Sequence, residues 1–168
     1  EMSLRGGCGH NEKTAHTVLT FEDYFDVLRP GRLPEYRRET LHAKVGAIDI
    51  KMLRTKHIPD SAPDWQSSFW SCGVIIDDRV LFTSDTRYDE DLVTVYDREF
   101  NFEAIFHDCQ FFTGGVHAGI DELKELPGDI KKKTYLAHYG DNWEQFEKKA
   151  AAYGFAGLAQ QHVYYRFE

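Results

Sequence analysis

The sequence lacks the features that mark several common classes of protein. No apolar run approaches the length of a membrane span, and no charged-then-apolar signal segment opens the chain. Internal repeats and low-complexity tracts are also absent from the sequence. The three cysteines, Cys8, Cys72 and Cys109, are an odd number at wide spacings, which favours a reducing compartment over a disulfide framework. We therefore expect a cytoplasmic protein with no membrane among its partners.

Basic residues are too few for a protein that binds a long stretch of nucleic acid. Lysine and arginine number 20 against 28 aspartates and glutamates, a formal net charge of −8. An extended nucleic-acid surface needs a basic face, so this class of partner is not expected. A small-molecule or nucleotide-type substrate held at a metal is compatible with this negative net charge, because the metal supplies the positive charge.

The composition that is present describes an ordered globular domain. Hydrophobic residues make up 42% and aromatic residues 14% of 168 residues, enough to bury a core, so we expect one domain over 1–168. The chain starts at Glu1 in a polar, glycine-rich stretch, and we expect the domain to be incomplete at its N-terminus. A homo-oligomer, or association with the missing N-terminal part, would then cover an apolar sheet face.

Apolar periodicity predicts a mixed α/β layer structure. Two β-hairpins come first, and β-loop-α units follow. The hairpins are predicted over about 39–56 and over 73–83, and the later strands over 102–107, 133–138 and 158–167. Helices are predicted over 20–28, 89–98, 119–126 and 142–153.

Three apolar strands each end on a residue that can bind a metal or transfer a proton. The first runs from Val80 to Asp85, the second ends at His107 and Asp108, and the third ends at His138. Ligands gather where strands end, because rigid strands hold loop-borne groups in place. Three such ends in succession predict a functional site.

Each of these residues also has a simpler structural interpretation. Asp85 could form an Asx turn or cap the next segment, and His138 could be a hydrogen-bonded structural histidine. His57, which follows the first hairpin, could be an ordinary surface histidine. It is their combination that favours a metal site.

Further candidates lie between the second and third strand ends. His107 and Asp108 are adjacent, so strand alternation points them to opposite sides, and both are not expected to be direct ligands. His117 follows Gly114-Gly115, a flexible segment that could bring it to a substrate. Cys109 has no oxyanion-hole pattern beside it, which favours a packed thiol over a nucleophile.

In this order and spacing, the motifs resemble the later half of the metallo-β-lactamase superfamily, in its ribonuclease Z-like branch. The matching segments are His57 ahead of Ser71-Cys-Gly-Val-Ile, Phe82-Thr-Ser-Asp85-Thr, Ile105-Phe-His107-Asp108 with Val116-His117-Ala, and Leu136-Ala-His138-Tyr. The resemblance covers roughly residues 40 to 140. It implies αββα layers of which only the later half is evident in this chain.

The resemblance also implies roles for these residues. Asp85 would bridge two divalent metal ions, with His57 on one ion and His138 on the other. Zinc is the first expectation for the metal, while manganese and iron also suit His/Asp ligands. His107 or His117 would serve as general acid or transition-state stabiliser, and Asp108 would orient it. The reaction implied is hydrolysis of a phosphodiester.

The sequence also departs from that family pattern. The signature His-x-His-x-Asp-His is absent from residues 1–168, so the dinuclear site would be completed by upstream sequence. Hydrolysis of a lactone, lactam or thioester stays open, because a fold does not dictate its substrate. A non-catalytic binding domain on a degenerate version of the fold is the alternative from a different class.

Overall fold

The computed structural model describes residues 21–167. The chain divides between Pro30 and Gly31 into two compact units. In residues 21–30 of the first unit, a single 3-10 turn, η1 (Phe21–Asp23), is followed by irregular chain in which Tyr24 and Leu28 are exposed. Of the helix predicted over 20–28, residue 20 lies outside the described residues, and only the one turn of η1 forms in the rest, so the prediction is wrong beyond that turn.

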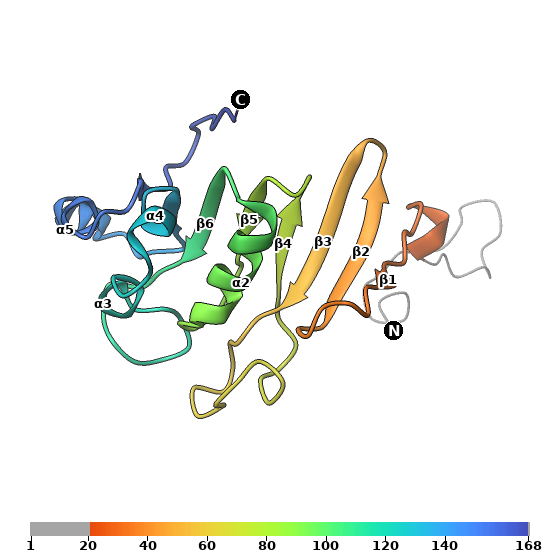
Figure 1. Ribbon diagram of the computed structural model, residues 1–168, viewed down its shortest axis with the longest axis horizontal. Helices are drawn as coiled ribbons and strands as arrows, with labels where there is room; N and C mark the ends of the chain where they lie inside the picture. Colours follow the sequence, from red (N-terminus) through yellow and green to blue (C-terminus); the bar gives the residue numbers. More distant parts are fainter. Residues whose placement is uncertain (1–20, 168) are drawn as a thin grey trace, which may run out of the picture. The chain divides into compact units, whose positions relative to one another are not determined.

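Within the described residues, the second unit contains a sheet of eight strands whose spatial order is their chain order (Figure 1). Neighbouring strands run antiparallel from β1 to β5 and parallel from β5 to β8. The predicted mixed α/β class is confirmed. The strands are β1 (Gly31–Arg32), β2 (Thr40–Val45), β3 (Ile48–Arg54), β4 (Cys72–Ile76), β5 (Val80–Phe82), β6 (Ala104–Asp108), β7 (Thr134–Ala137) and β8 (Gly157–Leu158).

Both predicted hairpins form, and their turns follow from local backbone chemistry. β2 and β3 meet at Gly46, whose φ of 62° lies in the left-handed region that glycine enters without strain. The turn between β4 and β5 has positive φ at both Asp77 and Asp78, as a type I′ turn requires. Aspartate tolerates this conformation better than most residues. These turns set the register of the antiparallel half of the sheet.

The helices are few and short, apart from one that covers the middle of the sheet. Figure 1 shows α2 (Glu90–Phe100) crossing in front of β4, β5 and β6. Its inward residues are buried against side chains from five strands: Leu92, Val93 and Tyr96 meet a core that includes Leu53, Ile75, Leu81, Ile105 and Leu136. The remaining helices are α3 (Ile120–Leu123), α4 (Gly128–Lys131), η2 (Trp143–Gln145) and α5 (Glu147–Ala152). No helix in residues 21–167 is long and apolar enough to cross a membrane.

Strand alternation in β6 separates two residues that could both have joined a site. Ile105 and His107 point to the α2 side and are completely buried in the core, whereas Asp108 points to the opposite face of the sheet. The predicted division of His107 and Asp108 between the two faces therefore holds.

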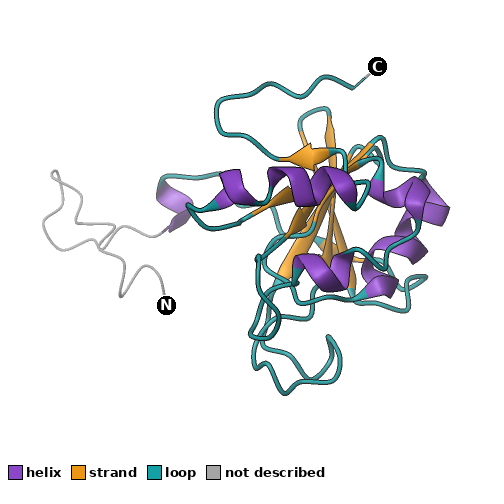
Figure 2. Cartoon of the chain, turned by 90° about the vertical axis from the view of Figure 1, so that its left-hand side faces the viewer, coloured by secondary structure: helices purple, strands orange, loops and turns teal. Residues whose placement is uncertain are grey.

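The C-terminal strand predicted over 158–167 is wrong. β8 ends at Leu158, and Figure 2 shows the chain beyond it as a loop that runs to the C-terminus. Tyr164 is 93% exposed, while the Tyr165 ring packs edge-on against the rings of Phe106 and Tyr135. Aromatic residues suggested a strand there, but the segment is held by the two ring contacts of Tyr165 and by a hydrogen bond from the Gln160 backbone N–H to the Tyr165 hydroxyl, and not by a ladder of strand pairing.

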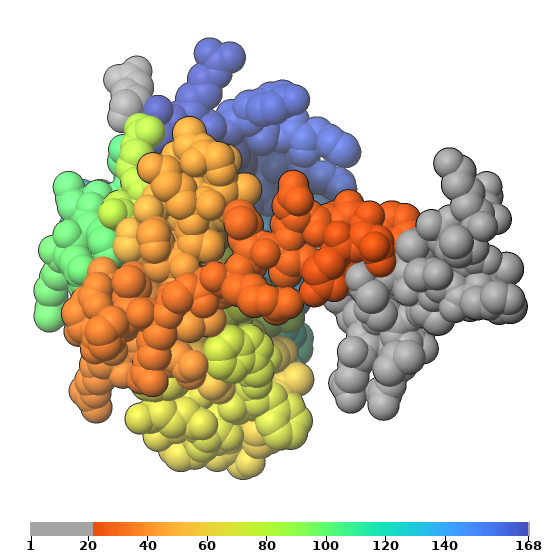
Figure 3. Space-filling view, turned by 90° about the vertical axis from the view of Figure 1, so that its right-hand side faces the viewer, coloured from red at the N-terminus to blue at the C-terminus, as the bar shows by residue number. Residues whose placement is uncertain are grey.

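A long loop, residues 55–71, connects β3 to β4 and carries His57. Figure 3 shows it, in yellow to yellow-green, as a bulge below β2 and β3. Two of its aromatic residues, Phe69 and Trp70, are exposed. The loop starts at the same edge of the sheet at which the predicted site residues lie.

Candidate metal site

Four of the predicted site residues come from strand ends at one edge of the sheet. β5, β6 and β7 are parallel, and β3 runs in the same direction because β4 is antiparallel to both β3 and β5. The carboxyl ends of these four strands therefore lie together. They deliver His57, Asp85, Asp108 and His138 to that edge.

Asp108 is the centre of the hydrogen-bond network. Its side chain is completely buried, and its Oδ2 accepts hydrogen bonds from the Thr86 backbone N–H (2.8 Å) and from His117 Nδ1 (2.7 Å). Its Oδ1 lies 3.1 Å from His138 Nδ1. Two imidazoles thus share one buried carboxylate, which fixes the Nδ1–H tautomer of both rings and leaves each Nε2 as the ligating or proton-transferring atom.

His57 presents a lone pair to Asp85. Its Nδ1 donates to the Val116 carbonyl at 2.9 Å, so its Nε2 carries no proton in the neutral ring. That Nε2 lies 3.9 Å from Asp85 Oδ2. With the ring in that neutral form, two acceptors face each other. Such a pair is stabilised by a cation, and the donor types suit zinc and similar ions.

Asp85 is held at the site through its backbone. The hydroxyls of Thr55 and Ser71 both donate to its carbonyl at 3.0 Å. The preceding Ser84 has a φ of 52°, which turns the chain sharply out of β5. The Asp85 carboxylate is left half-exposed, with Oδ1 3.5 Å from His138 Nδ1. It therefore lies between the two predicted metal-binding histidines.

Arg87 braces the start of loop 55–71, a role that the sequence analysis missed. Its guanidinium donates to the carbonyls of His57, at 3.1 Å, and of Asp60 and Ala62. The Arg87 N–H also donates to the Lys56 carbonyl. Its position two residues after Asp85 was the only available signal. An arginine that satisfies three carbonyls rigidifies the segment that positions His57.

His107 and Cys109 lie away from the site. The His107 ring is fully buried beneath α2, its Nδ1 bonds the Asp108 carbonyl at 2.7 Å, and burial lowers its pKa. Cys109 is fully buried, and burial raises its pKa to about 12. A thiol so protonated is a poor nucleophile, in agreement with the predicted packed thiol. Of the two histidines considered for proton transfer, only His117 is brought to the site.

The donor set fits a metal ion. Asp108, His117 and His138 each offer one ligand atom, and these atoms lie within 4.8 Å of one another. Together with the facing acceptors of His57 and Asp85, this makes an Asp/His cluster that could hold a metal. Beside it, a cavity of about 260 Å³ is lined by His117, Tyr88 and Gly114-Gly115. Both glycines have φ near 90°, so side chains are excluded from that wall.

Comparison with known proteins supplies the family. The sequence profile described as "Anti-Pycsar protein Apyc1" matches residues 1–165. The chain belongs to the Apyc1 family. It is 46% identical over 168 residues to the Anti-Pycsar protein Apyc1 of Bacillus phage 010DV004, with 97% of this chain and 60% of the relative covered. The protein of the same name from Bacillus phage BSP38 is 35% identical over 169 residues, with the same coverage. That of Paenibacillus harenae is 34% identical over 148 residues, covering 88% of this chain and 53% of the relative.

Apyc1 membership corrects the family suggested by the sequence. Assignment to the ribonuclease Z-like branch of the metallo-β-lactamase superfamily is wrong, because an Apyc1 match over almost the whole chain outweighs four short motifs. Short motifs at strand ends indicate a local arrangement of side chains, and different families can share such an arrangement. The chain spans about 60% of the length of the first two relatives.

Proposed function

We propose that this protein is a metal-dependent hydrolase that opens the cyclic phosphodiester of a nucleotide. The observation that carries the proposal is the geometry at the sheet edge: two facing acceptors, His57 Nε2 and the Asp85 carboxylate, lie beside a histidine held by a buried carboxylate. Membership of the Apyc1 family supports a cyclic nucleotide as the substrate.

Three residues are proposed to hold the metal. Asp85 would bridge two divalent ions, zinc being the first candidate, with His57 Nε2 on one ion and His138 on the other. When bound, such ions polarise a phosphodiester and lower the pKa of an attacking water. The alternative ligand set of Asp108, His117 and His138 is favoured by the mutual distances of their ligand atoms. Because Asp108 is already shared by two imidazoles and a backbone N–H, we assign it to orientation and not to ligation.

His117 is proposed as the general acid. Its Nδ1–H is held by Asp108, whose negative charge stabilises the imidazolium, and its Nε2 is free to donate a proton. Hydrolysis forms one P–O bond from water and breaks one P–O bond to the ribose. The departing ribose oxygen takes the His117 Nε2 proton, and a proton from the attacking water restores it. The product is a linear nucleoside monophosphate.

Other parts of the initial interpretation stay predictions. These are a single domain over 1–168, an αββα layering to which this sheet and α2 would contribute, a cytoplasmic location, and a homo-oligomer. A lactone, lactam or thioester substrate would use the same donors, and a binding-only protein would keep the fold without turnover. Measured metal content and turnover separate the last two possibilities, another substrate and a binding-only protein, from the proposed reaction.

The first test compares Asp85→Asn with Asp129→Asn in the full-length protein. The amide keeps the shape of Asp85 but loses the charge proposed to hold the metal, so metal content and cyclic-nucleotide hydrolysis should fall together. Asp129 is exposed and far along the chain in α4, so its variant controls for loss of one charge. Unchanged metal content and turnover in Asp85→Asn would overturn the proposed site.

A second variant separates metal binding from proton transfer. His117→Ala should retain metal and lose turnover by about 10²–10⁴-fold, the usual contribution of a general acid. Loss of metal in this variant would instead support Asp108, His117 and His138 as ligands. A metal-loaded wild-type protein that hydrolyses a lactone but no cyclic nucleotide would contradict the proposed substrate class.

A further inference from the structure

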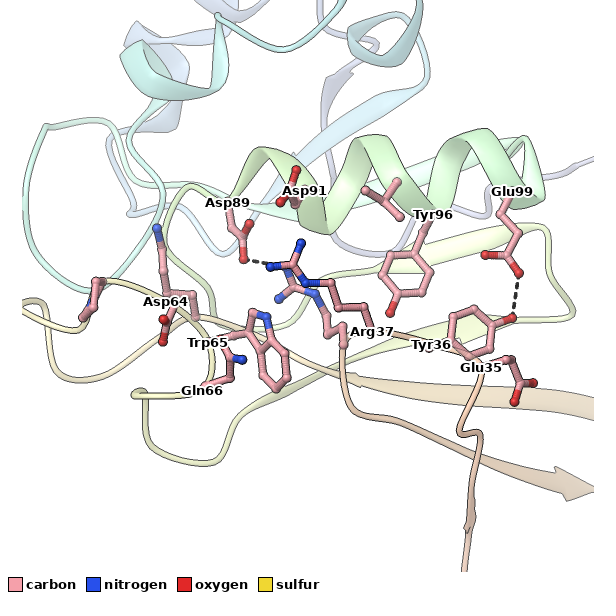
Figure 4. A pocket seen from close by; sticks show the side chains of 14 residues that line it. Glu35, Tyr36, Arg37, Asp64, Trp65, Gln66, Asp89, Asp91, Tyr96 and Glu99 are labelled. Carbon is pink, nitrogen blue, oxygen red and sulfur yellow. Dashed lines mark hydrogen bonds and ion pairs between the residues drawn. The ribbon is translucent and has the colours of Figure 1, made fainter.

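A second cavity, of about 430 Å³, lies apart from the Asp/His cluster. It is enclosed by α2, by the segment that precedes β2, and by loop 55–71 (Figure 4). None of Asp85, Asp108, His117 and His138 lines it. The volume lies within the range of small-molecule sites. We call it the α2 cavity.

One wall of the α2 cavity is Trp65, which is fixed by two arginines. The Arg38 guanidinium lies 5.5 Å from the Trp65 ring centre and is itself pinned by Asp89 (2.8 Å). Arg54 donates to the Trp65 carbonyl at 3.1 Å. Arg38 is almost completely buried, so its position is set by protein contacts and not by solvent. The indole is therefore preorganised.

The opposite wall is a pair of stacked tyrosines. Tyr36 and Tyr96 have ring centres 5.8 Å apart at 15°, and the Tyr36 hydroxyl donates to Glu99 at 2.8 Å. Burial, with help from that carboxylate, raises the pKa of Tyr36, so the hydroxyl stays protonated and keeps donating. In the view of Figure 4, Arg37 lies between Trp65 on one side and the tyrosines on the other.

Four charged side chains on the rim of the cavity make no hydrogen bond or ion pair within residues 21–167. Arg37 and Lys56 make no hydrogen bond or ion pair through their side chains in this part of the chain, and neither do Glu35 and Asp91. Internal partners already engage the other charged groups, such as Arg38, Asp89 and Glu99. The cavity thus combines fixed aromatic walls with free positive and negative side chains, which suits a ligand that has both an aromatic ring and polar or charged groups.

We propose that the α2 cavity is a second nucleotide site, which binds a nucleoside monophosphate. The base stacks on Trp65, Arg37 and Lys56 bind the phosphate, and Glu35 and Asp91 accept hydrogen bonds from sugar hydroxyls or an exocyclic amine. Aromatic stacking holds a base, cations hold a phosphate, and carboxylates pair with hydroxyl and amino donors. A nucleoside monophosphate carries a group for each of the three. The site shares Lys56 with the cavity beside the Asp/His cluster but contains none of the proposed metal ligands.

The test is calorimetric titration of the full-length, metal-loaded protein with adenosine 5′-monophosphate, adenosine and inorganic phosphate. The same titrations are made in Asp85→Asn, where the proposed metal site is disabled. Binding of the nucleotide should survive in Asp85→Asn, whether or not the wild type hydrolyses cyclic nucleotides. Binding that disappears in Asp85→Asn belongs to the sheet-edge site and would overturn the inference.

Two substitutions with matched controls locate the binding. Trp65→Ala should weaken nucleotide binding by roughly 5- to 150-fold, the range for loss of one stacked base. Trp70→Ala, in the same loop but outside the cavity, should leave it unchanged. Equal affinities in the two tryptophan variants would overturn the proposal.

Arg37 provides the second test, because it is exposed and its substitution leaves the frame intact. Arg37→Gln should weaken binding of the nucleotide at least several-fold while leaving the affinity for adenosine unchanged. Arg37→Lys, which keeps the positive charge, should retain most of the nucleotide affinity. Arg32→Gln, at an exposed arginine on β1, is the control. Loss of nucleotide and adenosine affinity in equal measure would contradict the assignment of Arg37 to the phosphate.

Discussion

His117 Nδ1 lies 2.7 Å from Asp108 Oδ2, and that carboxylate is completely buried. A buried carboxylate that accepts from His117, from His138 and from the Thr86 backbone has its acceptor sites occupied by the protein. These hydrogen bonds take the place of water around the buried charge. The contact between Asp108 and His117 therefore has two roles: it satisfies a buried acceptor in the fold, and it orients His117, the proposed general acid.

Asp108→Asn should therefore damage stability and turnover together. The amide offers one acceptor oxygen in place of two, and its NH₂ faces N–H donors, so a buried donor stays unpaired at a cost of about 1–3 kcal/mol. We expect a lower thermal midpoint, with Asp129→Asn as the control for loss of charge. A wild-type midpoint in Asp108→Asn would show that the carboxylate network contributes little.

Arg87→Ala should loosen the segment that carries His57. Three carbonyls lose their charged donor, so His57 is held less firmly and metal affinity should fall by about 10- to 100-fold, as for other residues that orient a ligand. Arg87→Lys should keep only part of the metal affinity, because an ammonium group cannot reproduce the planar guanidinium that donates to three carbonyls. Competition with a chelator measures the affinity. Equal affinity in wild type and Arg87→Ala would contradict the bracing role.

The Cys109 thiol should resist alkylation in the native protein. Burial removes access, and a pKa of about 12 keeps the thiol protonated at neutral pH. Mass spectrometry after iodoacetamide treatment at pH 8 should show Cys109 modified only after denaturation. Turnover of Cys109→Ala should stay near wild type, with a modest loss of stability. Loss of turnover in that variant alone would point to thiol chemistry.

The interactions of the ionised Asp121 carboxylate should stabilise the protein at neutral pH but not in strong acid. Its carboxylate accepts from Lys149 at 2.9 Å and from Tyr153 at 2.6 Å, and these bonds, that of Lys149 first, lower its pKa below 3.8. The stabilisation is therefore present above pH 3.8 and is lost as the pH falls through the folded-state pKa. Because the pair is well exposed, its contribution is about 0.2–1 kcal/mol.

The measurement compares thermal midpoints of wild type and Asp121→Asn at pH 7 and near pH 2.5. A difference at pH 7 that shrinks in acid is expected, and Asp129→Asn should show no such trend. A difference of equal size at both pH values would mean that the carboxylate charge is not the cause.

The sequence predicted the antiparallel hairpins and the three strand ends because their signals are local. Alternation from Leu41 to Met52 and the lone carboxylate after Val80–Phe82 depend only on neighbouring residues. The helix over 20–28 and the strand over 158–167 failed because the same residue types suit more than one local structure: within the described residues only the single turn η1 forms in the first segment, and β8 ends at Leu158 in the second. Periodicity reports what a segment can do, whereas tertiary contacts decide whether it does so.

Within the site, the sequence predicted which residues lie at strand ends, but it did not predict the contacts that hold those residues in position. Alternation separated His107 from Asp108, but nothing in the sequence indicated that Arg87 would clamp three carbonyls of a loop 25 to 30 residues earlier. The rings of the α2 cavity are equally non-local, since Tyr36, Trp65 and Tyr96 come from three separate segments. Such groupings exist only once the sheet has brought distant segments together.

The spatial order of the strands has a consequence for synthesis of the chain. Every strand pairs with its immediate predecessor, so the sheet can be extended one strand at a time as the polypeptide leaves the ribosome. His57 and Asp85 are in place once β5 has been added, but the carboxylate that orients the histidines arrives with β6 and the last histidine follows β7. A nascent chain therefore passes through a stage in which His57 and Asp85 are already placed, and His138, the last of these donors, is placed only after β7 has been added.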